Sequence, residues 1–218
     1  MEHPVERTPV PNASEPKTVF TTRMLVQLAL FLAIILLMKI TGLSSIHIGP
    51  LNMTLTMIPI AIGAMLLGPV PGALLGAFYG LTSLYDAISG GSVLTHAFFQ
   101  ISPFHTVILC VALRACVGYL TGILFLLLFR ADRHHTACYF LGGLVAPLLN
   151  TLLFMGYIVL VFYRTDTVQG YVEKLGASGP LMFVVLFVGV QGLVEAATGC
   201  VIGGSVAKGV AHALKRDR

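Results

Sequence analysis

The chain has 218 residues, of which 56% are hydrophobic and 10% charged, and its mean hydropathy is +0.91. Soluble domains carry about 25% charged residues, so this composition excludes an ordinary soluble enzyme and indicates an integral membrane protein. At about 20 residues per crossing the length allows roughly six membrane helices, and the net charge of +4 is expected to mark cytoplasmic loops rather than a nucleic-acid surface.

The first segment, residues 1–21, is polar and rich in proline, which does not fit a cleaved signal peptide. We expect a flexible N-terminal tail there, then one all-α membrane domain over residues 22–210, a compact bundle of six transmembrane helices, and a basic cytoplasmic tail over residues 211–218. The expected spans are the apolar runs 24–40, 51–67, 72–85, 103–129, 138–163 and 180–206.

The second and third spans are separated only by the run from Gly68 to Gly72, which contains two prolines and no charge. This run predicts a tight turn between two helices. The third span has about 14 residues, and at 1.5 Å per residue it is shorter than the hydrocarbon core. We therefore expect it to borrow flanking residues.

The basic residues predict the orientation. Six spans place both termini on one side, and most basic residues lie on that side, so the positive-inside rule predicts that both termini are cytoplasmic. The basic residues on that side are Arg7, Lys17, Arg23, Arg130, Arg133, Lys208, Lys215, Arg216 and Arg218. The outer loops are then 41–50, 86–102 and 164–179, and they predict an outward-facing binding site.

Small residues recur at every fourth position within the spans, a spacing that lets helix backbones approach closely in lipid. The repeats are Gly72, Gly76 and Gly80, then Gly118 and Gly122, and then Gly199 and Gly203. Most of these are expected to pack within the bundle. Ala29 and Ala33 form the same pattern on the first span, where both ordinary bundle packing and a partner interface remain open.

Few ionisable residues lie within the spans, and such residues are costly unless paired or functional. Arg114 lies about 11 residues into the fourth span and Glu195 about 15 residues into the sixth, while Lys39 and Asp86 lie near outer ends. One reading is an Arg114–Glu195 ion pair that only locks helices together. The other is that Arg114 or Lys39 receives an anionic or carbonyl-rich ligand.

Asn150 and Gln191 offer uncharged donors and acceptors within the fifth and sixth spans. They suit a site for a small polar ligand, with hydrogen bonding between helices as the alternative. His47, His96 and His105 share the outer face, but they are far apart in the sequence and Asp86 is the one carboxylate near them. We therefore expect no metal site.

Several motifs are missing from the sequence: it contains no GxxxxGK[ST], no HExxH, no GxSxG and no CxxC. The chain is therefore not expected to bind ATP itself, to carry a cofactor or to be a common type of membrane hydrolase. Two rival functions remain: a membrane enzyme acting on lipid or prenyl substrates, and a structural subunit of another membrane complex.

A set of short runs, taken together in their order and spacing, resembles the substrate-binding S components of energy-coupling factor (ECF) vitamin transporters, closest to their pantothenate-like branch. The runs are Gly49-Pro50-Leu51-Asn52, Ile58-Pro59, Leu66-Leu67-Gly68-Pro69, Gly80-Leu81-Thr82-Ser83, Ile101-Ser102-Pro103 followed by Arg114 and Gly118, Leu149-Asn150-Thr151-Leu152-Leu153-Phe154-Met155-Gly156, and Glu195.

The resemblance implies a subunit of the bacterial plasma membrane that binds a vitamin at its outer face. It implies docking of the first helix, through Ala29 and Ala33, on a transmembrane scaffold that couples to two cytoplasmic ATPases, and delivery by toppling in the membrane. Pantothenate would suit the donor set best, with pyridoxine, folate or riboflavin as alternatives. The expected substrate-binding residues are Arg114, Asn150, Gln191, Glu195, Asn52 and Lys39.

Overall fold

The computed structural model describes residues 21–42, 45–48, 51–132 and 136–213. Within these residues the chain is helical except for one two-stranded antiparallel hairpin. The elements are α1 (Thr22–Ile40), β1 (Ser45–Ile48), β2 (Leu51–Thr54), α2 (Met57–Leu67), α3 (Pro69–Ser89), α4 (Val93–Ile101), α5 (Pro103–Val107), η1 (Ile108–Ala112), α6 (Leu113–Ala131), α7 (Ala137–Tyr157), η2 (Ile158–Phe162), α8 (Asp166–Leu175), α9 (Pro180–Thr198), η3 (Gly199–Gly203) and α10 (Gly204–Ala213).

The hairpin corrects the predicted second span. The apolar run was expected to be helical from Leu51, but Leu51–Thr54 pairs with Ser45–Ile48 as a strand. Short apolar runs do not distinguish a strand from a helix by composition. The second helix therefore begins at Met57, and its 11 residues span about 17 Å.

The predicted turn between the second and third helices is confirmed. Gly68 ends α2 with φ 99°, a backbone conformation that favours glycine, and Pro69 follows as the first residue of α3. The third helix borrows residues at both ends, as expected, and runs for 21 residues until Gly90 ends it with φ 82°.

Three of the long helices contain a π-helical turn. Residues 103–131 form one continuous rod through η1, residues 137–162 continue into η2, and η3 joins α9 to α10. Short π segments inside α-helices are frequent at functional sites. The last helix reaches Ala213, three residues beyond the expected end of the membrane domain at residue 210.

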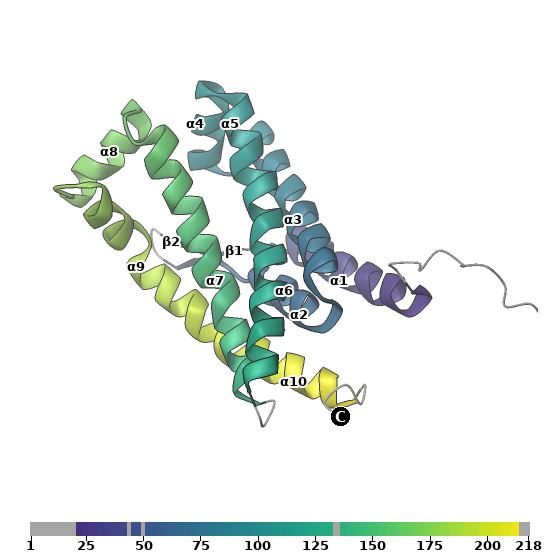
Figure 1. The fold of residues 1–218 in the computed structure, drawn as a ribbon. Helices are drawn as coiled ribbons and strands as arrows, with labels where there is room; N and C mark the ends of the chain where they lie inside the picture. Colours follow the sequence, from purple (N-terminus) through teal and green to yellow (C-terminus); the bar gives the residue numbers. More distant parts are fainter. Residues whose placement is uncertain (1–20, 43–44, 49–50, 133–135, 214–218) are drawn as a thin grey trace, which may run out of the picture.

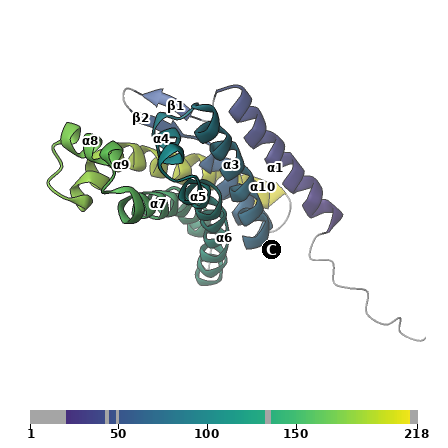
Figure 2. The same cartoon turned by 90° about the horizontal axis from the view of Figure 1, so that it is seen from above.

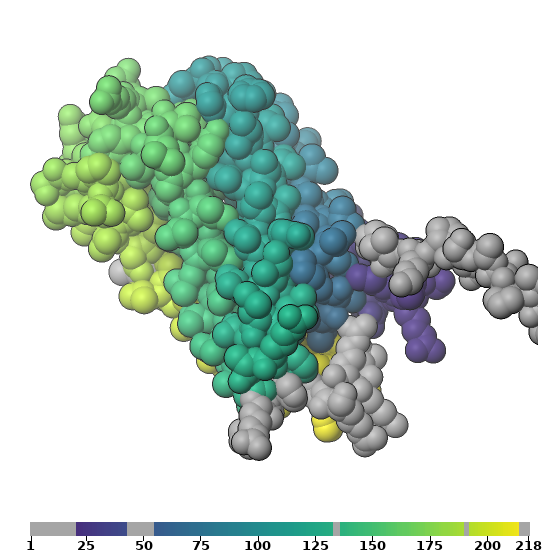
Figure 3. Space-filling model, viewed as in Figure 1, coloured from purple at the N-terminus to yellow at the C-terminus, as the bar shows by residue number. Residues whose placement is uncertain are grey.

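The helices are arranged around α2, α6 and α7. In Figure 1, α4, α5 and α8 lie at the upper end, and α10 lies at the lower end with the C-terminal end of α6 and the N-terminal end of α7. Seen from above, α1 flanks α3 on one side of the molecule, and α8 and α9 lie on the other (Figure 2). In the space-filling view α6 and α7 form the front face, while α1 is at the edge (Figure 3).

Buried side chains form three clusters. The first joins α2, α6, α7 and α10, the second joins α4, η1, α7, η2, α8 and α9, and the third joins α1, α2 and α3. The short helix α2 contributes to two clusters and is apolar all round, which is typical of a helix enclosed by others. Tyr79 of α3 belongs to the third cluster.

The glycine repeats predicted to pack within the bundle do so at the contact of α3 with α6. A Cβ added to Gly76 would lie 2.1 Å from the carbonyl oxygen of Arg114, and one added to Gly118 would lie 2.0 Å from that of Gly72. The two backbones are therefore in direct contact along this seam.

Four helices in the described part of the chain are long and apolar enough to cross a membrane: Thr22–Ile40, Pro103–Ala131, Ala137–Phe162 and Gly192–Ala213. A fifth is added if Asp166–Leu175 and Pro180–Gly189, which meet at a 73° bend, count as one span. The chain is a multi-pass membrane protein. A helix lies within each of the six predicted apolar runs, but α2 and α3 are not among the helices that are long and apolar enough to cross a membrane.

Candidate functional site

Arg114 is the central residue of the candidate site. It lies in the first turn of α6, directly after η1, and is 9% exposed. Its Nη1 donates a long hydrogen bond of 3.4 Å to the carbonyl oxygen of Cys110. Its Nε is buried and has no hydrogen-bond partner among the described residues. A buried guanidinium donor without an acceptor is costly, so this arrangement favours an acceptor from outside the chain.

Two aromatic rings contact the Arg114 guanidinium. Its central carbon lies 4.6 Å from the ring centre of Tyr79 on α3 and 5.3 Å from that of Phe154 on α7. Cation–π contacts of this kind partly compensate the burial of the charge without using the N–H donors. Arg114 of α6 is thus packed between rings from α3 and α7, and neither ring satisfies its Nε–H.

The contact of α3 with α6 explains how Tyr79 reaches Arg114. Gly76 and Gly80 flank Tyr79 on α3 and bring that helix against the backbone of Arg114 and Cys110. A larger residue at either glycine would separate the helices and remove the ring from the guanidinium. Sequence reasoning identified these glycines as packing residues but missed Tyr79, although its position between them was the available signal.

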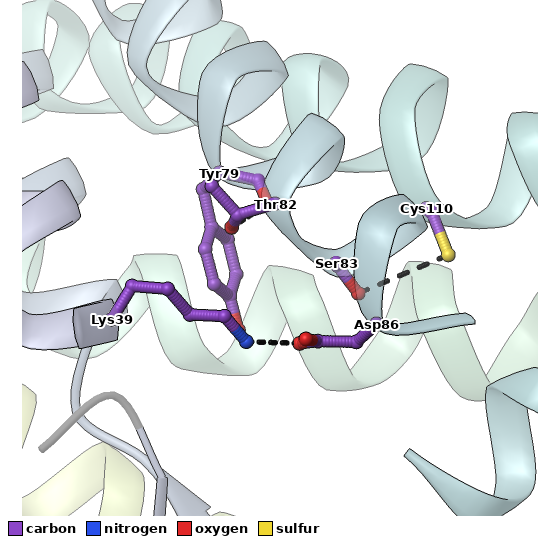
Figure 4. A network of polar contacts seen from close by, with 6 residues as sticks. All are labelled: Lys39, Tyr79, Thr82, Ser83, Asp86 and Cys110. Carbon is purple, nitrogen blue, oxygen red and sulfur yellow. Dashed lines mark hydrogen bonds and ion pairs between the residues drawn. The ribbon is translucent and has the colours of Figure 1, made fainter. Parts of the chain in front are cut away.

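Lys39 and Asp86, both predicted near outer ends of helices, form an ion pair between α1 and α3. The two side chains are partly buried, with 28% and 24% exposure. Figure 4 shows Lys39 extending across to Asp86, with the ring of Tyr79 extending toward the same ammonium group. The sequence marks both residues as charges near helix ends but does not indicate that they form a pair.

An Arg114–Glu195 ion pair, one of the two alternatives that the sequence leaves open for Arg114, is not found among the described residues. Glu195 is nevertheless buried, at 5% exposure, on α9. Asn150 is half-buried on α7, one turn before Phe154 and therefore on the same helix face. Helices α7 and α9 approach closely at this depth, since a Cβ on Gly192 would lie 3.7 Å from Thr151 Oγ1.

Two further predicted residues are placed only by their backbone. Asn52 lies in β2 opposite His47, and that strand contacts α9. Gln191 lies in α9, one turn before Glu195. The side chains of Asn52 and Gln191 are outside the described part of the structure.

The outer histidines take part in structural contacts. Nδ1 of His96 lies 2.8 Å from the carbonyl oxygen of Ala87, and Nδ1 of His105 lies 2.8 Å from the hydroxyl of Tyr157. In the described ranges no three His, Cys, Asp or Glu side chains come close enough together to hold a metal ion.

The predicted docking residues lie on the outside of α1. Ala29 and Ala33 are exposed, whereas Leu28 and Ile35 of the same helix are buried against α2 and α3. Leu25 and Leu36 extend the exposed stripe and are 50% and 45% exposed. The small-residue pattern is therefore not used in packing within the chain.

Two shallow cavities, of about 280 and 240 Å³, lie near the C-terminal end of α6 and the N-terminal end of α7. Apolar side chains dominate both, and neither is lined by a predicted substrate residue. The lining residues are Leu128, Ala131, Asp132, Ala137, Cys138 and Leu141 in the first, and Met65, Leu66, Phe125, Leu126, Phe129, Tyr139 and Ala211 in the second.

Comparison with known proteins gives one family and one fold. The family model of the ECF transporter substrate-specific component matches residues 23–202. A search of curated proteins finds no match. The solved structure of ThiT from Listeria monocytogenes is similar with a TM-score of 0.58, covering 85% of this chain and 93% of that chain at 14% identity, a likeness that shows the fold alone.

Proposed function

Because the chain belongs to the family of ECF transporter substrate-specific components, we propose that it captures a carboxylate-bearing vitamin at the outer face of the bacterial plasma membrane. In this proposal all six apolar helices cross the membrane and both termini are cytoplasmic. Members of the family are transport subunits and not enzymes, which removes the membrane-enzyme alternative and also a purely structural role in another complex.

The observation that carries this proposal is the buried Arg114 with its unpartnered Nε. A guanidinium binds a carboxylate through two parallel charge-assisted hydrogen bonds. Pantothenate combines a carboxylate with an amide and two hydroxyls, which Asn150 and Gln191 are suited to bind. Pyridoxine and riboflavin have no carboxylate, and folate is larger, so pantothenate is the ligand proposed here.

The remaining predicted residues complete the proposed site. Glu195 is buried on α9 and Asn52 lies on the strand beside that helix, so both are proposed to contact the hydroxyl end of the ligand. Lys39 is also proposed to act at this site. Because its ammonium group forms an ion pair with Asp86, Lys39 can contact a ligand directly only by sharing or leaving that pair.

Transport requires partners, since ECF substrate-specific components work with a scaffold and an ATPase module, and this sequence has no phosphate-binding loop. We propose that the scaffold docks on α1, where Ala29 and Ala33 leave room for a close helix contact. ATP is then used by two partner ATPases, and the docked subunit topples to carry the ligand inward.

The test is Arg114→Gln, measured by calorimetric titration with pantothenate and with its neutral alcohol analogue pantothenol. Losing a charge-assisted hydrogen bond costs about 1.5–3 kcal/mol, so pantothenate affinity should fall roughly 10- to 150-fold. The wild-type protein should bind pantothenol as weakly as the variant binds pantothenate.

Arg130→Gln is the matched control, because Arg130 is exposed near the other end of the same helix. It should leave pantothenate affinity unchanged. If Arg114→Gln lowers only the melting temperature and binds pantothenate as tightly as wild type, Arg114 is a structural residue and the proposed site is wrong.

A further inference from the structure

Helix α1 is attached to the rest of the chain along a narrow strip. Leu28 and Ile35 are its two buried residues, and most of its other apolar side chains are exposed. Lys39 lies one turn after Ile35 and therefore on the same face of the helix. Its ion pair with Asp86 thus adds a polar contact at the outer end of this strip.

On α3, the matching face carries Tyr79 and Asp86, which are two helical turns apart. Tyr79 packs in the cluster that holds α1 through Leu28 and Ile35. The same ring lies 4.6 Å from the guanidinium carbon of Arg114. The Tyr79 side chain therefore contacts both the buried cluster beneath α1 and Arg114, the proposed substrate-binding residue. In Figure 4 it extends toward the Lys39 ammonium.

From this geometry we infer that the Lys39–Asp86 ion pair is a joint, meaning a rigid connection between α1 and α3. It fixes the outer end of α1 and, through Tyr79, positions Arg114 for the ligand. Lys39 is then a positioning residue that acts on the substrate through the placement of helices and not by contact. The inference rests on the proposed binding of a carboxylate at Arg114. It links the helix that carries Ala29 and Ala33 to the ligand site.

A joint and a direct ligand contact predict opposite effects of the same substitution. If Lys39 contacted the ligand carboxylate, Asp86 would compete for the ammonium, and Asp86→Asn would strengthen binding. If the pair is a joint, removing either partner leaves the other without its counter-charge and loosens α1. Asp86→Asn and Lys39→Met should then both weaken pantothenate binding, by roughly two- to five-fold for a partly exposed pair.

The charge swap, Lys39→Asp combined with Asp86→Lys, separates the two readings further. It restores an ion pair between the helices but places a carboxylate where the ammonium was. A joint predicts that the swap recovers most of the affinity lost in the single variants. A direct contact predicts that the swap binds pantothenate more weakly than either single variant, because the new carboxylate at position 39 repels the ligand.

The placement of α1 is measured without ligand by the distance between two spin labels in lipid nanodiscs. Leu37 on α1 and Leu152 on α7 are 63% and 68% exposed and accept the labels after substitution by cysteine. Cys116 and Cys200 are first replaced by serine, because they are exposed or partly exposed, whereas the other two native cysteines are buried.

The expected result is a narrow distance distribution in the wild-type background, a broad one in both single variants, and a narrow one again in the swap. Unchanged distributions in the single variants would overturn the joint, and so would stronger pantothenate binding by Asp86→Asn. If the wild-type protein does not bind pantothenate, the proposed ligand is wrong, while the label distances still decide whether the ion pair fixes α1.

Discussion

Replacing Gly76 by alanine tests whether the close contact between α3 and α6 positions Arg114, the proposed substrate-binding residue. The added Cβ would lie 2.1 Å from the carbonyl oxygen of Arg114, 2.8 Å from its carbonyl carbon and 3.2 Å from Cα of Ala115. Cβ atoms do not approach other heavy atoms closer than 3.0 Å, so the helices must separate by at least 0.9 Å. All three contacted atoms are backbone, and no side-chain rotation relieves the clash.

The cost follows from these distances. Over-packing of a well-packed contact costs about 1–3 kcal/mol, and a clash with backbone belongs at the upper end of that range. Alanine recovers about 1 kcal/mol through its higher helix propensity. The free energy of unfolding should therefore fall by about 2 kcal/mol, which lowers the melting temperature by roughly 4–8 °C. Pantothenate affinity should fall as well, because the displaced carbonyl belongs to Arg114.

A thiol-reactive dye measures the melting temperature in a background in which Cys116 and Cys200, which are exposed or partly exposed, are replaced by serine, because the remaining Cys110 and Cys138 are buried and react only on unfolding. The matched control is Gly156→Ala on α7, where an added Cβ meets no atom within 4 Å. That variant should melt at or slightly above the wild-type temperature. If Gly76→Ala also melts at or above the wild-type temperature and keeps its pantothenate affinity, the close contact between α3 and α6 does not position Arg114.

Three other outcomes are expected. Ala29→Trp with Ala33→Trp should leave pantothenate binding intact, since both residues are exposed on α1, but should abolish co-purification with the scaffold and ATPases; loss of ligand binding would instead place these alanines in the fold of the chain. In liposomes the protein alone should bind pantothenate without accumulating it, and accumulation driven by a sodium or proton gradient would identify a secondary carrier. Asp132→Ala should destabilise the start of α7 by about 0.5–2 kcal/mol, because the Asp132 carboxylate accepts hydrogen bonds of 2.9 Å from the backbone N–H groups of Thr136 and Cys138; an unchanged melting temperature would show that this cap contributes nothing.

Much of the fold was predictable because its signals are local. The proline-containing turn at Gly68 and the four-residue spacing of glycines each depend on a few neighbouring residues, and both agree with the structure, as do the apolar runs apart from the start of the second. The strand at Leu51–Thr54 was not predicted, because strand formation there depends on pairing with Ser45–Ile48 and not on its own composition.

For the candidate site, the sequence singles out unusual residues but does not predict how they are arranged. Burial in an apolar run identified Arg114 and Lys39 as unusual, since charges in lipid are costly. Their partners were not predictable, because Tyr79, Phe154 and Asp86 come from other helices whose rotation is set by packing. Of the two alternatives for Arg114, the ion pair with Glu195 is not found among the described residues, because similar depth in the membrane does not mean the same face of neighbouring helices.

The π-helical turn η1 has a consequence for how this site tolerates changes in chain length. A π turn accommodates one residue more than an α turn, and one residue corresponds to about 100° of helix rotation. Deleting a single residue from Ile108–Ala112 would therefore restore a regular helix while rotating everything that precedes it relative to Arg114. The segment with His105 would then face away from its partner Tyr157 although no residue on either side of the deletion had been replaced. In this region the number of residues, and not only their identity, carries the information that specifies the site.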